Sequence, residues 1–98
     1  MTVKTPVKEL FMREKHTEQK LIADAKARGG LAVKFVSPGF DGMPDRAVLL
    51  PGGHIGFVEV KAPGKVPRPQ QRARLRLLTG LGFKTYVLDE TGLHVEGN

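Results

Sequence analysis

The sequence predicts an α/β domain in which two helices flank a central mixed sheet. A long helical pattern precedes three strand-like segments, and a second helix separates these from one or two closing strands. Alternation of this kind is typical of sheets that have helices packed on their faces. The chain has 98 residues, of which 40% are hydrophobic and 27% charged, so we expect residues 1–98 to form a single globular domain.

The first half of the chain shows a helix followed by strands. Apolar residues recur at helical spacing over residues 7–28, and Gly29 and Gly30 end this pattern. Leu31, Val33 and Phe35 then alternate with Lys34, which predicts a strand over residues 31–36. An irregular loop rich in Pro and Gly is expected over residues 37–44, and a hairpin over residues 45–61 with its turn at residues 51–53.

The second half contains another loop, a short helix and the end of the sheet. Pro69 suits the first position of a helix, and Gly80 and Gly82 mark its end, so a helix is expected from Pro69 to about Thr79. Two closing strands are expected over residues 85–89 and 93–96, with a turn between them. Tyr86 and Phe83 are interpreted as core residues, whereas Phe40 has less reason to be buried because it lies in a loop.

Basic residues exceed acidic ones and are concentrated in one part of the chain. Sixteen Lys and Arg against ten Asp and Glu give a net charge of +6. The segment from Lys61 to Lys84 holds seven basic residues and no acidic one, which favours a polyanionic partner, nucleic acid first. A solvated helix face is the alternative. The candidates for contact with a DNA backbone are Lys34, Lys65, Arg68, Arg72 and Arg76.

Several classes of protein are excluded by what the sequence lacks. With no Cys, it can form neither disulfides nor thiolate metal sites. The three His residues share no ligand spacing, which argues against a His-based zinc site. The apolar runs are far shorter than the roughly 20 residues that span a bilayer, and the N-terminal residues do not resemble a secretion signal. We therefore expect a cytoplasmic protein with no membrane partner and no small-molecule cofactor.

The hairpin brings two carboxylates together. If the turn is centred on Gly52, Asp45 lies opposite Glu59, and directly opposed residues have Cβ atoms about 5 Å apart on one face of the sheet. Lys61 is two residues beyond Glu59 and therefore projects from the same face. This cluster could hold a divalent cation through oxygen ligands while the lysine faces a phosphate.

A purely structural ion cluster is the alternative for these three residues. Two details weigh against it. Glu59 lies in an apolar run, where an uncompensated carboxylate is costly. Asp45 follows Pro44 at the junction of a loop and a strand, where functional groups are common.

The same residues resemble the PD-(D/E)-x-K nuclease motif. Pro44-Asp45 is followed, after thirteen residues, by Glu59-Val60-Lys61. The string from Gly42 to Gly53, together with the Gln residues after Pro69, is similar to the VRR-NUC (virus-type replication-repair nuclease) domain over about residues 13–89. This resemblance implies a stand-alone, phage or bacterial type of the domain and a restriction-endonuclease-like core with the order α-β-β-β-α-β.

The resemblance also implies roles for individual residues. Asp45 and Glu59 would bind Mg²⁺, for which Mn²⁺ could substitute, with the Val60 carbonyl as a further ligand. Lys61 would orient or activate the attacking water and stabilise charge on the phosphate. The helical acid of the family matches Glu18 best, since Leu21, Ile22 and Ala25 share its helix face, and Glu14 is the alternative.

Gln71 is the matching glutamine in the second helix. Leu75 and Leu78 follow it at helical spacing, so it points with them toward the sheet, where it could hold a ligand carboxylate or a water. The alternative is a residue that caps the backbone amides at the start of the helix.

The resemblance implies a metal-dependent endonuclease that cuts branched DNA in replication, repair or recombination. We expect a homodimer acting on four-way (Holliday) junctions, because two cuts need two sites and a two-fold dimer presents two identical ones. The apolar residues expected at its interface are Phe11, Met12, Leu81 and Phe83. The alternatives are a monomeric flap or nicking nuclease and a non-catalytic module that binds nucleic acid.

Overall fold

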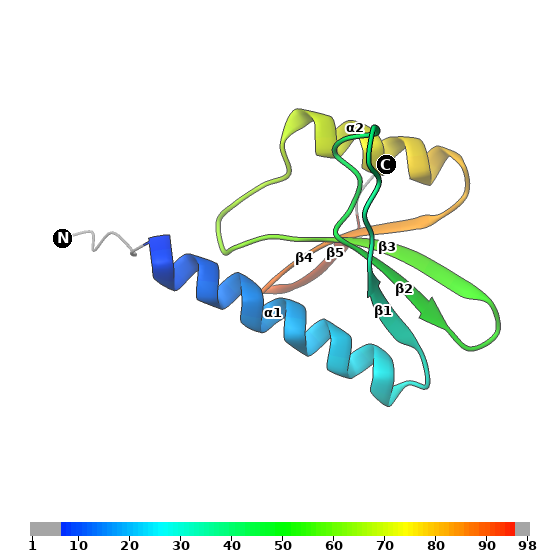
Figure 1. Ribbon diagram of the computed structural model, residues 1–98, viewed down its shortest axis with the longest axis horizontal. Coiled ribbons are helices and arrows are strands. Elements are labelled where there is room, and N and C mark those ends of the chain that lie inside the picture. The colour runs from blue at the N-terminus through cyan, green and yellow to red at the C-terminus, as the bar shows by residue number, and fades with distance from the viewer. Residues whose placement is uncertain (1–6, 96–98) are drawn as a thin grey trace.

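A five-stranded mixed sheet forms the centre of the protein (Figure 1). The computed structural model describes residues 7–95, with side chains from Arg13 onward. The strands lie in chain order, and each neighbouring pair is antiparallel except β3 and β4, which are parallel. The elements are α1 (Val7–Ala27), β1 (Leu31–Lys34), β2 (Arg46–Leu50), β3 (His54–Val60), α2 (Pro69–Gly80), β4 (Lys84–Asp89) and β5 (Gly92–Val95). The predicted α/β class with a mixed sheet flanked by helices is confirmed.

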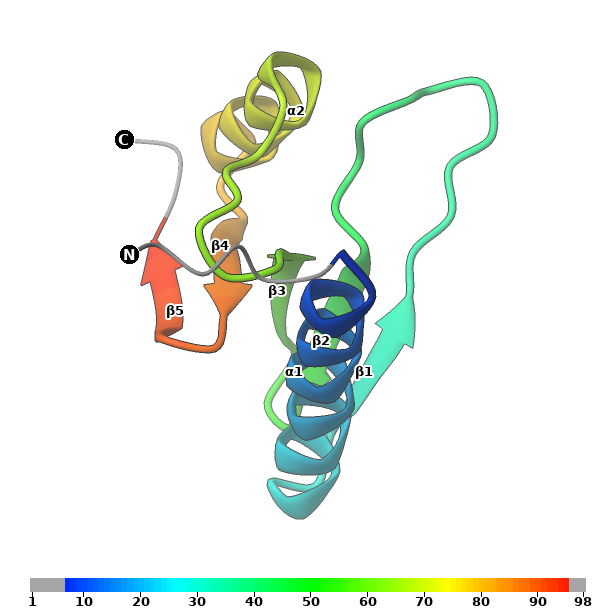
Figure 2. The same cartoon turned by 90° about the vertical axis from the view of Figure 1, so that its left-hand side faces the viewer.

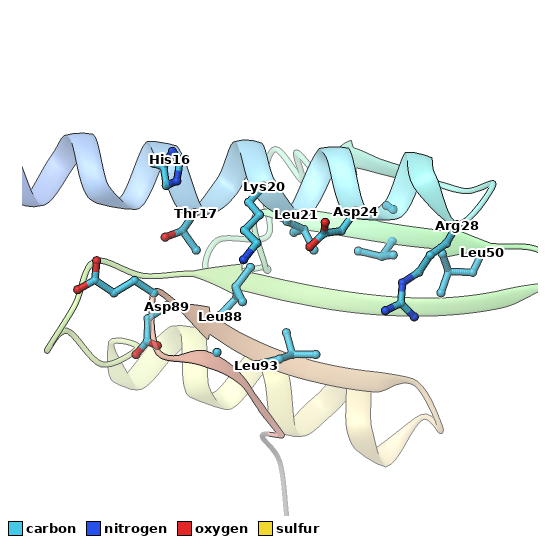
Figure 3. A pocket seen from close by; sticks show the side chains of 14 residues that line it. His16, Thr17, Lys20, Leu21, Asp24, Arg28, Leu50, Leu88, Asp89 and Leu93 are labelled. Carbon is cyan, nitrogen blue, oxygen red and sulfur yellow. The ribbon is translucent and has the colours of Figure 1, made fainter.

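The two helices lie on opposite faces of the sheet (Figures 1 and 3). α1 crosses β1 to β4 on one face, and α2 packs against β4 on the other. Leu78 of α2 joins Ala47 and Phe57, which oppose each other on β2 and β3, in a buried cluster. Side chains alternate between the two faces along a strand. Residues two or four positions from Ala47 and Phe57 therefore share the α2 face, and the residues between them share the α1 face.

The register of the β2–β3 hairpin is the predicted one. Leu50 pairs with His54 and Arg46 pairs with Val58. Gly52 and Gly53 have φ of 88° and 78°, a backbone conformation that residues with a Cβ rarely adopt, so the turn depends on these glycines. The register continues past the last pair, which places Asp45 opposite Glu59.

The first strand differs from its prediction in length and in the face that it buries. It ends at Lys34 rather than Val36. Leu31 is 57% exposed and Val33 39% exposed, whereas Ala32 between them is buried. The physical reason is the position of the helices: α1 covers the face of Ala32, and α2 does not extend over β1. Phe35 beyond the strand is partly buried against the Phe57 cluster.

Other differences are small. The first helix ends at Ala27, and the closing strands begin one residue earlier than expected. Phe83, predicted to be a core residue, is 39% exposed, although its ring packs edge-on against Phe57. Tyr86, also predicted to lie in the core, is half-buried. The expected strand residue Glu96, and the side chains of Phe11 and Met12, lie outside the described part. None of the helices within residues 7–95 has the length and apolar character to cross a membrane.

Candidate active site

Asp45 and Glu59 are held together by reciprocal hydrogen bonds between the two hairpin strands. The backbone N–H of Asp45 donates to Oε1 of Glu59 at 3.2 Å, and the N–H of Val60 donates to Oδ2 of Asp45 at 2.9 Å. Each carboxylate is thus fixed by the backbone of the opposite strand. Pro44, fully buried, limits movement of the chain just before Asp45.

Glu59 is a buried acid in a repulsive environment. Its side chain is 1% exposed, and Oε2 lies 3.3 Å from the Lys61 ammonium. Burial raises the pKa of Glu59 to about 7, the charge of Asp45 adds to the rise, and Lys61 opposes it. A carboxylate that is this costly to ionise would gain from a second positive charge.

The donor set fits a hard divalent cation. Oε2 of Glu59 is buried and is not engaged by a backbone donor; its neighbour is the Lys61 ammonium at 3.3 Å. A cation between two adjacent carboxylates would relieve their repulsion, and Mg²⁺ prefers oxygen ligands of this kind. Among the side chains that the structure describes, from Arg13 to Val95, however, no group of three or more His, Asp or Glu is preassembled as a metal site. Asp45 and Glu59 therefore form its core, and the remaining ligands would include water.

The two candidate acids on α1 have different surroundings. Oε1 of Glu18 accepts a hydrogen bond from Nη2 of Arg46 at 3.0 Å. Glu14, one turn earlier, is partly buried; burial and then the charge of Asp45 raise its pKa above the usual value, and Lys61 opposes the rise. Glu14 thus lies within electrostatic reach of the carboxylate cluster, while Glu18 is engaged in an ion pair.

Arg46 is a structural residue of the site that the sequence analysis missed. Its largely buried guanidinium donates to the Ala32 carbonyl at 3.2 Å as well as to Glu18, so it links α1, β1 and β2 directly beside Asp45. The signal was present, because an arginine at the start of an apolar strand needs a partner when it is buried.

Gln71 takes part in a helix cap. Its Oε1 accepts a hydrogen bond from the backbone N–H of Arg68 at 2.9 Å, just before the first turn of α2. This hydrogen bond is the helix cap that the sequence analysis gave as the alternative role of Gln71. The side chain is half-buried, and α2 begins with its amide oxygen engaged.

The candidate DNA-contacting residues lie around the start of α2 and at the end of β1. All but Arg72 are exposed, and Arg72 is half-buried. Arg74 of the same helix is engaged with the loop before Asp45. Exposed cations before and along α2, such as Arg68 and Arg76, are suited to contact with phosphates, because such contacts need charge and reach rather than a pocket.

A hollow of about 530 Å³ lies away from the carboxylates, between α1 and strands β4 and β5 (Figure 3). Apolar side chains such as Leu21, Leu50 and Leu88 line it, with Lys20, Arg28 and Asp24 of α1 at its rim. Neither Asp45 nor Glu59 is among its lining residues, so its size has no bearing on the chemistry of the hairpin cluster.

The fold and the site define the chain as a nuclease of the PD-(D/E)-x-K type. Its sequence is 48% identical over 83 residues to "Putative nuclease p44" of Acyrthosiphon pisum secondary endosymbiont phage 1, covering 85% of this chain and 89% of that protein. A solved structure described as "VRR_NUC domain" superposes with a TM-score of 0.74 at 31% identity, covering 79% of this chain and 84% of the other. No family model matches the sequence. The chain belongs to the VRR-NUC family.

Proposed function

We propose that the protein is a Mg²⁺-dependent DNA endonuclease whose active site is the cluster of Asp45, Glu59 and Lys61. The observation that carries this proposal is the burial of Glu59 beside a second carboxylate, with its Oε2 in an ion pair with the Lys61 ammonium 3.3 Å away. A fold has no need to bury one acid beside a second, half-buried one, and such sites are characteristic of catalysis.

The residues of the cluster have distinct roles in phosphodiester hydrolysis. Asp45, Glu59 and the Val60 carbonyl would hold Mg²⁺ or Mn²⁺. The bound ion would lower the pKa of the attacking water and polarise the phosphate. Lys61 orients that water and stabilises the negative charge that develops on the phosphate oxygens. Its contact with Glu59 keeps the ammonium directed at the cluster.

An acid from α1 would complete the site. Glu18 has the better sequence spacing, but its ion pair with Arg46 would have to break before it could bind a cation. Glu14 needs no such change, and the charges of Asp45 and Lys61 already act on it. The charges that act on Glu14 therefore favour it as this acid, with Glu18 holding α1 in place through Arg46.

Branched DNA is the proposed substrate, and the basic residues are its phosphate contacts. The net charge of +6 attracts any nucleic acid. Selection among DNA shapes would depend instead on how the active sites, and therefore the cuts, are arranged in space. A homodimer with two sites suits a four-way junction, consistent with a role in repair or recombination.

The α2 face of the sheet offers a surface for the second copy. Beyond the end of α2, this face carries exposed apolar side chains on β1, β2 and β3 and at the residue before β4. This open sheet face consists of Leu31, Val33, Leu49, Ile55 and Phe83. Two cationic copies can meet at the open sheet face without bringing like charges together. Burial of this face would also remove apolar surface from water. Leu81, also expected at the interface, is exposed near the end of α2.

A cleavage assay tests the proposal. Labelled four-way junction, flap and plain duplex of matched sequence are incubated with the protein in Mg²⁺ or in EDTA. Cleavage of junctions in Mg²⁺ alone supports the proposed function. Nicking of flaps alone by a monomer would favour the flap nuclease, and binding without cleavage in Mg²⁺ would favour the non-catalytic module.

A further inference from the structure

We propose that Phe40 is a stacking platform for an unpaired base of the DNA substrate, braced from behind by Arg74. The inference rests on the proposed function and specifies its substrate: DNA with an unstacked base that the loop before Asp45 can reach. Phe40 lies in the loop between β1 and β2, which extends away from the sheet beside α2 (Figure 2) and ends at Asp45.

The loop is fixed to α2 rather than free. The Arg74 guanidinium lies over the Phe40 ring, 3.8 Å from its centroid, and Nε of Arg74 donates to the Asp41 carbonyl at 2.8 Å. One planar side chain thus holds both the ring and the backbone beside it. A lysine could supply the charge but not this combination of stacking and directed hydrogen bond.

The chain between Phe40 and Asp45 is also closely packed. Gly42 has φ of 89°, and a Cβ there would lie 2.9 Å from the Gln70 side chain, so only glycine lets the loop approach α2 this closely. Met43 packs against the Ala47 cluster, and Pro44 is fully buried. The position of Phe40 relative to Asp45 is therefore set before any ligand arrives.

Phe40 differs from Phe35, Phe57 and Phe83 in what its ring contacts. Phe35, Phe57 and Phe83 meet edge-on in a row beneath the α2 face. Phe40 is 41% exposed and has a cation on one side of its ring. A ring held in this way can receive a base with little loss of conformational entropy, because its orientation is already fixed.

A base is the ligand that fits this arrangement. Aromatic side chains stack on any base, and the cation nearby attracts the phosphates of the same strand. In an intact duplex each base is stacked between two neighbours, whereas at branch points and flaps the regular stack is interrupted and a base is more easily unstacked. The platform would therefore favour branched DNA over duplex through contact with an unstacked base.

The test uses DNA binding and fluorescence with full-length protein. 2-Aminopurine is placed at the branch point of a four-way junction and at the same position of a matched duplex, in Ca²⁺ to limit cleavage. We expect the wild-type protein to quench the junction probe by stacking. Phe40→Leu should abolish the quenching and raise the Kd for junctions roughly 10-fold, with less than about 2-fold change for duplex. Phe40→Trp should retain both properties.

Two further variants separate stacking from charge and from fold. Arg74→Lys keeps the charge but loses the brace, so quenching should weaken while the salt dependence of binding stays the same. Arg72→Ala combined with Arg76→Ala is the contrasting control, which should flatten the salt dependence by roughly two charges and leave quenching intact. The melting temperature of each variant confirms that it is folded.

Equal quenching and affinity in Phe40→Leu and wild type would overturn the stacking proposal, and so would an equal loss of affinity for junction and duplex. In either case wild-type cleavage in Mg²⁺ would leave the nuclease proposal intact. A wild-type protein that cleaves no DNA in Mg²⁺ would instead contradict the proposed function itself.

Discussion

The two ends of the β2–β3 ribbon differ in which side chains they bury. At the end nearest the loops, the α2 face carries Asp45 and Glu59, and Glu59 is fully buried. At the hairpin end, the same face carries Leu49 and Ile55, which are 36% and 42% exposed. One strand pair therefore hides charge at one end and exposes apolar surface at the other.

Both arrangements oppose the usual preference of a folded chain. A buried carboxylate costs free energy unless it is paired, and exposed Leu and Ile give up the stabilisation that burial would provide. The difference teaches that neither end is complete in the isolated chain: the charged end is suited to a cation and a phosphate, and the apolar end to another protein surface. The following predictions, from the largest expected effect to the smallest, test each end.

Glu59→Gln should have the largest effect. Cleavage should fall roughly 1,000-fold or more, because ligand-held metal stabilises the transition state by several kcal/mol. DNA binding should be retained or slightly improved, since one negative charge near the phosphate is removed. Any rise in melting temperature on addition of Mg²⁺ should also disappear. Glu90→Gln is a control at an exposed acid, and full activity in Glu59→Gln would remove this site from consideration.

Glu14→Gln should affect cleavage, whereas Glu18→Gln should affect stability. We expect Glu14→Gln to reduce cleavage about 100-fold, a loss typical of one positioned electrostatic group, with a small effect on stability. Glu18→Gln should mainly lower the melting temperature, because it breaks the ion pair with Arg46. Single-turnover cleavage and thermal unfolding measure both. The reverse pattern would make Glu18 the helical acid.

Ile55→Lys tests the apolar end. A charge in the open sheet face should break the proposed dimer and halve the mass seen by light scattering to about 10.7 kDa. Paired cuts of a junction should become single nicks, with about a 10-fold drop in resolved product. Leu93→Lys, at an exposed apolar position on β5, is the matched control. A wild-type monomer would show that this face has another purpose.

The pH dependence of stability should be a smaller effect of the charged end. Because the pKa of Glu59 is about 7 in the folded protein, against 4.5 ordinarily, the folded state binds the extra proton between these values. In EDTA, the free energy of unfolding should therefore fall as the pH rises from about 5 to 8. The change is of order 1–3 kcal/mol, since one pKa unit corresponds to about 1.4 kcal/mol. In Glu59→Gln, the free energy of unfolding should not show this contribution to the decline with pH, as measured from thermal unfolding curves at several pH values.

Much of the fold follows from local sequence. The helix ends, the Gly-dependent turn at Gly52 and Gly53 and the register that opposes Asp45 to Glu59 depend on neighbouring residues and on the fixed period of a strand. These features are encoded within a few residues of where they occur, so a pattern can predict them.

The face that a strand buries depends on more than its own pattern. Leu31 and Val33 have the alternation of a buried strand, yet they are exposed, because α2 ends before it reaches β1. Phe83 is exposed for a related reason, since it lies where the α2 face of the sheet opens. Burial is a property of where other elements are placed, which a single strand does not specify.

In the site, too, some features follow from local sequence and others only from tertiary packing. The sequence by itself determined which acids and which lysine converge, because hairpin geometry links Asp45, Glu59 and Lys61 through backbone periodicity. Only the tertiary structure decided that Arg46 pairs with Glu18, that Glu14 lies within reach of Asp45, and that Arg74 anchors Phe40. Each of these contacts joins segments far apart in the chain, and its energy depends on distance and burial, which exist only after the helices have packed on the sheet.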